Sequence, residues 1–238
     1  TSKFSTLKRR LASISVIHKL NGHYLDTKHP LITENLLGIK RVKGTYQKSK
    51  KPILINDLKT IINAIDKEKN EKKGIRNKAL LLIGFAGGFR RSELVEIFFE
   101  DIEFVNEGVK IFVKRSKTDQ SGEGMIKGIP YFANPNYCPV HSLKNWINEN
   151  KDQTGKIFNI SDKNVALIIK KYAEKAGLDQ NKYSGHSLRS GFATSTAEQG
   201  AEERSIMAMT GHKTTQMVRR YIREANLFKN NALNKIKI

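Results

Sequence analysis

The longest apolar stretch of the sequence, Ala79 to Phe89, constrains the fold more than any other feature. It falls far short of the roughly 20 apolar residues that a membrane-spanning helix requires. Beyond Lys78 the segment from Arg76 to Phe85 is nearly all apolar, which predicts a helix that is buried on all sides. With 238 residues, the chain is long enough to bury such a helix in the core of one large or two smaller domains.

Further helices are predicted where apolar residues recur with a period near 3.6, and strands where short apolar runs flank turn residues. The expected strands are Asp101–Val105 and Val109–Val113, joined by Asn106-Glu107-Gly108, and a third at 125–132. Helices are expected at 5–21, 30–39, 53–65, 139–149, 162–176, 186–199, 202–209, 214–226 and 229–236. We therefore predict a mainly α fold with a small antiparallel β-sheet (α+β).

The charge balance points to a polyanionic partner. The sequence has 43 Lys and Arg against 23 Asp and Glu, a formal charge of +20, and such an excess favours nucleic acid. No basic amphipathic helix suggests a membrane surface, and a merely basic protein is the less favoured alternative. One cysteine excludes a disulfide framework and a multi-cysteine zinc site. The opening residues lack a signal peptide, so we expect a cytoplasmic, DNA-associated protein.

Composition divides the chain into a helical piece at 1–39, a basic linker at 40–52 and a larger domain at 53–238. The linker contains no acidic residue. Its basic residues fit a segment that follows DNA phosphates, but a solvated tether explains them equally well. The linker residues that we expect to bind DNA are Lys40, Arg41, Lys43, Lys48, Lys50 and Lys51.

Two motifs place arginines where they would bind an anion. In Gly87-Gly88-Phe89-Arg90-Arg91-Ser92-Glu93-Leu94, the glycines allow a sharp turn that aims an arginine inward. In Ser184-Gly185-His186-Ser187-Leu188-Arg189, a histidine and an arginine share one face near a helix N-terminus, which favours an anion. Taken singly, the first motif is better explained by an ordinary surface pair of Arg90 with Glu93, and a capped helix with exposed side chains explains the second equally well.

Two further motifs carry a histidine, a tyrosine and a lysine. Thr210-Gly211-His212 is followed by Tyr221, which shares a helical stripe with apolar residues and, taken singly, is better explained as an ordinary core tyrosine. Lys117 follows a strand and precedes a Ser/Gly-rich loop, but one lysine in so basic a chain is weak evidence.

Together, and in this order, the motifs GFRRSEL, RSKTDQ, GHSLRSGFAT, TGH and VRRYI resemble those of the tyrosine recombinase, or phage integrase, family. The likeness runs from about Pro52 to Lys229. It implies that Tyr221 is the nucleophile and that Glu93 orients the site without itself contacting the phosphate. Arg91 is then the neighbour of the phosphate-binding arginine. Residues 1–39 resemble part of the family's helical core-binding domain. By resemblance, the residues around the scissile phosphate are Arg90, Lys117, His186, Arg189 and His212.

The residue types suit a transesterification that needs neither metal nor cofactor. Arginines can clamp the non-bridging phosphate oxygens, His186 can accept the tyrosine proton, and Lys117 can protonate the departing 5′-oxygen. We expect His212 to donate to the phosphate. The cluster of Glu100, Asp101 and Glu103 makes a poor Mg²⁺ cage, since their side chains would point to opposite sides of a strand.

The resemblance implies a bacterial or phage-encoded, site-specific recombinase of a mobile element that integrates or excises DNA. The alternatives are an enzyme like type IB topoisomerases, which generally have lysine in place of His186, and a non-catalytic DNA-binding protein of the same fold. The expected partner is double-stranded DNA. We expect a monomer in solution and a homotetramer on paired sites, linked by the exchange of helix 229–236, although that helix could instead pack on its own subunit.

Overall fold

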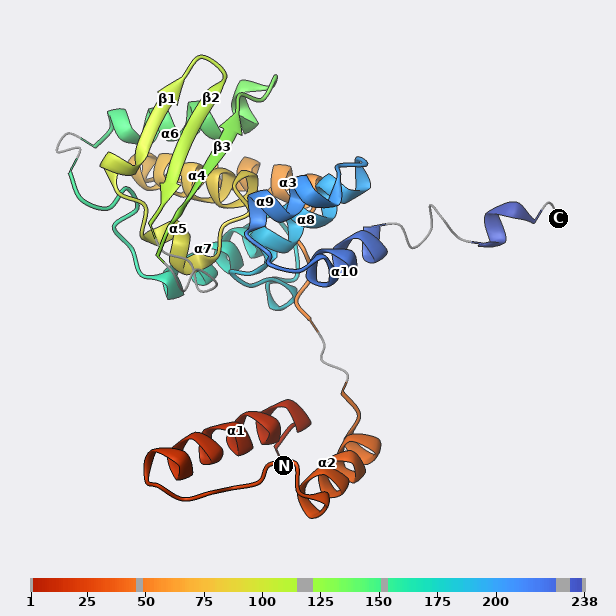
Figure 1. Ribbon diagram of the computed structural model, residues 1–238. Helices are drawn as coiled ribbons and strands as arrows, with labels where there is room; N and C mark the ends of the chain where they lie inside the picture. The colour runs from red at the N-terminus through yellow and green to blue at the C-terminus, as the bar shows by residue number, and fades with distance from the viewer. Residues whose placement is uncertain (1, 46–48, 115–121, 151–153, 226–231, 237–238) are drawn as a thin grey trace. The chain divides into compact units, whose positions relative to one another are not determined.

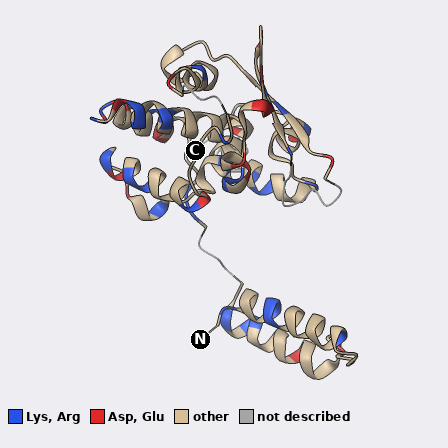
Figure 2. Ribbon diagram, turned by 90° about the vertical axis from the view of Figure 1, so that its left-hand side faces the viewer, with Lys and Arg blue, Asp and Glu red and all other residues tan. Residues whose placement is uncertain are grey.

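The structure, a computed structural model, describes residues 2–45, 49–114, 122–150, 154–225 and 232–236 (Figure 1). It divides into two compact units, Thr1–Ser49 and Lys50–Ile238. The first unit consists of helices α1 (Phe4–Leu20) and α2 (Pro30–Lys43). None of the residues in these two helices is buried. Basic residues lie in both halves of α1 but only in the last turn of α2 (Figure 2).

Helix α2 is longer than the sequence pattern predicts. His29 caps its N-terminus by accepting a hydrogen bond from the backbone N–H of Leu31, and Pro30 occupies the first turn. Instead of ending near Ile39, the helix continues to Lys43, where basic residues in the last turn complement the helix dipole. Three residues expected in the basic linker, Lys40, Arg41 and Lys43, therefore belong to helix α2.

The second unit is mainly helical. Its central helix, α4 (Glu71–Ala86), begins five residues before Arg76 because the Asn70 side chain caps it by accepting from the backbone N–H of Lys73. A short helix, α5 (Arg91–Val95), follows α4 and was not predicted, since five residues are too few to show helical periodicity. The other helices are α3 (Ile55–Ile65), α4 (Glu71–Ala86), α6 (Pro139–Asn148), α7 (Asp162–Lys175), α8 (Ser187–Glu198), α9 (Glu203–Thr210) and α10 (Thr215–Ala225).

The three predicted strands form one antiparallel sheet in the order β1 (Ile102–Val105), β2 (Gly108–Val113) and β3 (Met125–Pro130). Val105 pairs with Gly108 across the predicted hairpin, and Ile111 pairs with Lys127 of β3. The inner face of the sheet carries Val109, Ile111 and Ile129, which join the hydrophobic core. Figure 1 shows the sheet beside α4 and α6.

Most of the buried apolar side chains of this unit belong to one cluster, which we call the main core. It is centred on α4, whose residues from Ala79 to Ile83 are almost completely buried, as the apolar stretch predicts. Side chains of α3, α6, α7 and the sheet surround it, and Leu188 brings in the start of α8.

A second, much smaller cluster joins α8, α9 and α10. It contains Ala193, Ala197, Ile206 and Val218, with Tyr221 and two other side chains partly buried against it. We call this group the small cluster. It holds the last long helix of the described chain against the rest of the unit.

The remaining expectations concern the end of the chain and membranes. Residues 229–231 of the predicted C-terminal helix lie outside the described residues, and Ala232–Lys235 form a 3₁₀ turn. No helix in the described part of the chain has the length and apolarity needed to cross a bilayer.

Candidate active site

The turn after α4 positions Arg90. Gly88 adopts a φ of 55°, which lets the chain reverse, and the next residue, Phe89, is buried in the main core. The Arg90 backbone N–H donates to Glu93 Oε2 at 2.9 Å, and its Nη1 donates to Glu93 Oε1 at 2.5 Å. Glu93 is only 4% exposed. The alternative of an ordinary surface pair is therefore wrong, because a buried carboxylate orients the guanidinium.

The start of α8 brings Arg189 to the same turn. The side chain of Arg189 is among the largest that are fully buried, with 1% of the residue exposed. Its Nη1 donates to the Gly88 carbonyl oxygen at 2.9 Å, so the two arginine-bearing segments are joined directly. His186 occupies the N-cap position of α8, one turn earlier, and makes no side-chain capping hydrogen bond, and part of the residue is exposed to solvent.

His212 reaches Arg189 from the other side. Helix α9 ends at Thr210, and Gly211 has a φ of 63° in the left-handed region, which reverses the chain. His212 Nε2 then lies 3.1 Å from Arg189 Nη2, and its Nδ1 lies 2.7 Å from Thr210 Oγ1. The described residues thus form a continuous chain of contacts from the Gly88 turn to His212.

Helix α10 completes the group with Tyr221. Val218 is fully buried in the small cluster, and Tyr221 lies one turn later on the same face, partly buried. The Tyr221 hydroxyl is 3.3 Å from His186 Nε2, and its ring centroid is 6.1 Å from that of His212. Tyr221 therefore packs against the small cluster and also directs its hydroxyl toward His186. We call Arg90, Arg189, His186 and His212 the basic group.

The pKa values of the group follow from burial and from mutual repulsion. Burial lowers the pKa of Arg189 to about 10, and Arg90 adds to the effect. Burial also lowers the pKa of His212 to about 4, with Arg189 and Arg90 acting in the same direction. Partial burial and the same guanidinium groups lower the pKa of His186. Both histidines are therefore neutral at pH 7, while Arg189 stays charged, and the site attracts an anion.

Comparison with known proteins identifies the family to which these site residues belong. The sequence model of the phage integrase family matches residues 53–227, which include every residue placed in the group above. The chain belongs to the phage integrase family, the tyrosine recombinases. It is 42% identical over 250 aligned residues to an "Integrase/recombinase xerD homolog" of Selenomonas ruminantium, covering 99% of this chain and 73% of that protein.

Other relatives of this phage integrase chain are less than 30% identical to it. The tyrosine recombinase XerA of Pyrococcus furiosus is 28% identical over 73% of this chain and 57% of its own length. Among solved structures, the XerA recombinase has a TM-score of 0.60 at 18% identity over 99% of this chain and 84% of its own. The XerH recombinase in a post-cleavage complex has a TM-score of 0.61 at 20% identity, over 82% of this chain and 57% of its own. At these identities the structural matches establish the tyrosine recombinase fold.

Lys127 is a residue of this phage integrase site that the sequence analysis missed. It is 1% exposed, and its Nζ donates to the carbonyl oxygens of Gly87, at 2.6 Å, and Met209, at 2.5 Å. The ammonium group also lies 4.4 Å from the centre of the Phe89 ring. Lys127 thus ties the Arg90 turn to the end of α9. Burial lowers its pKa to about 7.

The sequence contained a signal for Lys127. In a strand, residues two apart share a face, so Lys127 lies on the same side as the apolar Ile129. A lysine at an inward position of a strand indicates a buried polar role.

The expected DNA-binding residues lie in different settings. Lys117 and Lys48 lie outside the described residues. Lys50 Nζ donates to the Asn181 carbonyl oxygen, and Lys51 forms an ion pair of 2.8 Å with Asp57. The Arg91 side chain covers Gly185, where an added Cβ would lie 1.8 Å from its Cδ.

Residues Lys51 to Ile53 are attached to the segment that precedes and opens α8. The Lys51 backbone N–H donates to the Lys182 carbonyl oxygen at 2.7 Å, and that of Ile53 donates to the Ser187 carbonyl oxygen at 2.9 Å. Gly191 lets helix α8 approach the backbone of Ile53 closely, because a Cβ at Gly191 would lie 1.9 Å from the Ile53 carbonyl oxygen.

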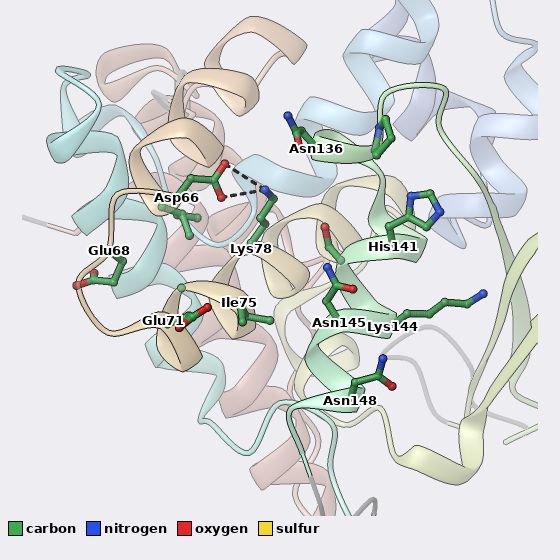
Figure 3. A pocket seen from close by; sticks show the side chains of 14 residues that line it. Asp66, Glu68, Glu71, Ile75, Lys78, Asn136, His141, Lys144, Asn145 and Asn148 are labelled. Atoms are coloured by element: carbon green, nitrogen blue, oxygen red, sulfur yellow. Dashed lines mark hydrogen bonds and ion pairs between the residues drawn. The ribbon is translucent and has the colours of Figure 1, made fainter.

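A separate hollow of about 800 Å³ lies between the α3–α4 connection and α6 (Figure 3). An ion pair between Asp66 and Lys78 spans one side, and His141 and several asparagines line the other. Its described lining includes none of the residues placed in the basic group. Within the described part of the chain, no cluster of His, Cys, Asp or Glu has the arrangement of a metal site.

Proposed function

We propose that the chain, a site-specific recombinase by its family, breaks and rejoins DNA strands through a covalent bond between Tyr221 and a 3′-phosphate. The observation that carries the proposal is the Tyr221 hydroxyl 3.3 Å from His186 Nε2, beside a buried and charged Arg189. A phenol has a pKa near 10, so the nucleophile needs both a base and nearby positive charge.

Arg90 and Arg189 stabilise the phosphate in this proposal. Negative charge accumulates on the non-bridging oxygens of the transition state, and fixed guanidinium groups lower its energy without having to reorganise. Glu93 and the Gly88 carbonyl oxygen hold the two side chains in place.

The proton steps balance as follows. The Tyr221 oxygen attacks phosphorus while its proton passes to His186, which is neutral at pH 7 and therefore free to accept it. The bond from phosphorus to the 5′-oxygen breaks, and Lys117 supplies the proton to that oxygen. Rejoining reverses these steps with the 5′-hydroxyl of another strand. The phosphotyrosine conserves the bond, so no nucleotide cofactor or metal is required.

The covalent step is tested by mixing the full chain with nicked suicide DNA that carries its recombination site and separating the products by denaturing electrophoresis. The site is first mapped at the junctions of the encoding element. A band of protein bound to DNA is expected for the natural chain and for Tyr24→Phe, whose ring is 88% exposed in the first unit. Tyr221→Phe should abolish the band and leave DNA affinity nearly unchanged. Adducts that persist in Tyr221→Phe would exclude this nucleophile.

Strand exchange between two duplex sites separates a recombinase from an enzyme like type IB topoisomerases. We expect exchange, since His186 stands where those topoisomerases generally carry lysine. Relaxation of supercoiled DNA without exchange would favour the topoisomerase, and binding without any adduct would favour a non-catalytic protein.

Assembly is part of the proposal. We expect a monomer in solution and a homotetramer on paired DNA sites, held by residues 229–238 of each subunit on its neighbour. Sedimentation of a chain ending at Phe228 with two-site DNA tests this. Tetramers that persist in the truncated chain would refute the exchange and favour packing on the same subunit. A cytoplasmic location likewise stays a prediction.

A further inference from the structure

Thr210 contacts the site through a buried hydroxyl group that the catalytic steps above do not use. The residue ends α9 and is 1% exposed. Its Oγ1 lies 2.6 Å from the Ile206 carbonyl oxygen and 2.7 Å from His212 Nδ1. On the opposite side of the imidazole, Nε2 lies 3.1 Å from Arg189 Nη2.

These partners assign the proton of the neutral imidazole from both sides. A carbonyl oxygen only accepts, so the single hydroxyl proton of Thr210 goes to Ile206, and Thr210 Oγ1 accepts from Nδ1–H of His212. Arg189 only donates, so His212 Nε2 must accept. The two arguments are independent and give the same tautomer, with the proton on Nδ1.

We propose that Thr210 is a positioning residue that holds the His212 ring with its proton on Nδ1. His212 Nε2 then accepts a hydrogen bond from Arg189 Nη2 until a phosphate binds. The inference rests on the proposed function, because it assumes that a DNA phosphate enters this site. It adds a step to the expectation that His212 donates to the phosphate, since in the free protein Nε2 carries no proton and must first gain one.

The arrangement changes when an anion arrives. A phosphate oxygen is a stronger acceptor for Arg189 Nη2 than a neutral imidazole nitrogen, and it replaces Nε2. Arg189, Arg90, His186 and Lys127 around His212 all disfavour its protonation in the free protein, and the titratable Tyr221 ring lies 6.1 Å from the His212 ring. A phosphate offsets their charge, so that His212 takes a proton from solvent at Nε2 and donates it in a hydrogen bond to the phosphate.

Two variants of Thr210 separate its hydroxyl from its methyl group. The methyl group packs at the Gly88 turn, where an added Cβ would lie 3.2 Å from Thr210 Cγ2. Thr210→Val keeps a methyl group there and removes the hydroxyl, whereas Thr210→Ser removes the methyl group and keeps the hydroxyl. If the hydroxyl positions His212, serine preserves the arrangement and valine does not.

The test is nuclear magnetic resonance of the full chain with ¹⁵N-labelled histidine and without DNA, with His212 assigned through the loss of its signals in His212→Gln. In the natural chain and in Thr210→Ser, we expect a slowly exchanging ring proton on Nδ1 and an unprotonated Nε2. In Thr210→Val, that proton should exchange with water and its signal should disappear.

Formation of the covalent adduct is the second readout. We expect a roughly tenfold slower rate in Thr210→Val, a rate close to natural in Thr210→Ser, and unchanged DNA affinity in both. A natural chain with the proton on Nε2 would overturn the proposal without any variant. An Nδ1 proton signal that persists in the valine variant, or is lost in the serine variant, would also overturn it. Absence of adducts in the natural chain would instead refute the proposed function, because the resonance experiment needs no catalysis.

Discussion

The two arginines and the tyrosine of the site are supported by very different amounts of packing. Arg90 and Arg189 follow or adjoin buried residues of the main core, Phe89 and Leu188. Tyr221 stands on the small cluster, where Val218 is the one fully buried apolar side chain that α10 contributes among its described residues. The two arginines are therefore attached to the larger of the two clusters, and the proposed nucleophile is attached to the smaller.

This difference has a physical meaning for catalysis. Electrostatic stabilisation is effective when the charged groups are held in place before the reaction, so they belong on a rigid support. A nucleophile that must approach, bond to and leave a phosphate tolerates a support of lower local stability. We expect α10 to open locally at a lower free energy than α4.

The largest expected effect comes from the main core. Leu80→Ala removes a fully buried side chain and should lower the free energy of unfolding by about 2–5 kcal/mol. Urea denaturation measures the loss, and hydrogen exchange should accelerate throughout the second unit. If only the amides of α4 were affected, the main core would not unfold as one body.

Lys127 should have the next largest effect, because it joins the two turns that carry Arg90 and His212. Lys127→Met leaves the carbonyl oxygens of Gly87 and Met209 without this partner, and we expect a loss of about 1–3 kcal/mol of stability. Adduct formation should slow as well. Lys110→Met on the neighbouring strand is the control, since that lysine is exposed and its ion pair with Glu103 contributes little. Equal losses of stability in both variants would show that Lys127 does not hold the two turns together.

Val218→Ala tests the small cluster. Removing two methyl groups should cost about 1–2 kcal/mol, felt mainly as faster hydrogen exchange in α10. Exchange in α4 should stay unchanged, and adduct formation should fall more than DNA affinity does. Met217→Ala on the same helix is the control, because Met217 is exposed. Faster exchange in both helices would show that the two clusters unfold together.

The smallest effect near neutral pH should come from His212. Its pKa is lowered from about 6.5 when unfolded to about 4 when folded, so the unfolded chain binds more protons between these values. The stabilising difference is complete above pH 6.5 and is lost as the pH falls toward 4. Urea denaturation at pH 7 and 5.5 should show a smaller loss for His212→Gln than for the natural chain. An identical loss would mean that His212 titrates normally.

Much of the fold follows from the sequence because local pattern and burial agree. The apolar run of α4, the Asn106-Glu107-Gly108 hairpin and the helical stripe that contains Tyr221 each encode their element in neighbouring residues. The group around Arg189 was expected only through family resemblance, since Gly88, Arg189 and His212 are far apart in the chain. The neighbouring sequence does not predict the contact of Lys127 with Met209, nor the chain of contacts from Thr210 through His212 to Arg189. Tertiary packing creates both. The length of α2 was underestimated because its last turn is basic rather than apolar.

The attachment of Lys51 and Ile53 beside the start of α8 has a consequence for protein engineering. A chimera that exchanges the first unit for another DNA-reading module needs a junction that leaves these backbone pairs intact. Composition suggests a cut at Ile53, but such a cut would replace Lys50 and Lys51, which are hydrogen-bonded to Asn181 and Lys182 in the segment that precedes α8. The boundary between the two compact units lies before Lys50, so a chimera should keep the second unit from Lys50 onward, three residues earlier than the change in composition suggests.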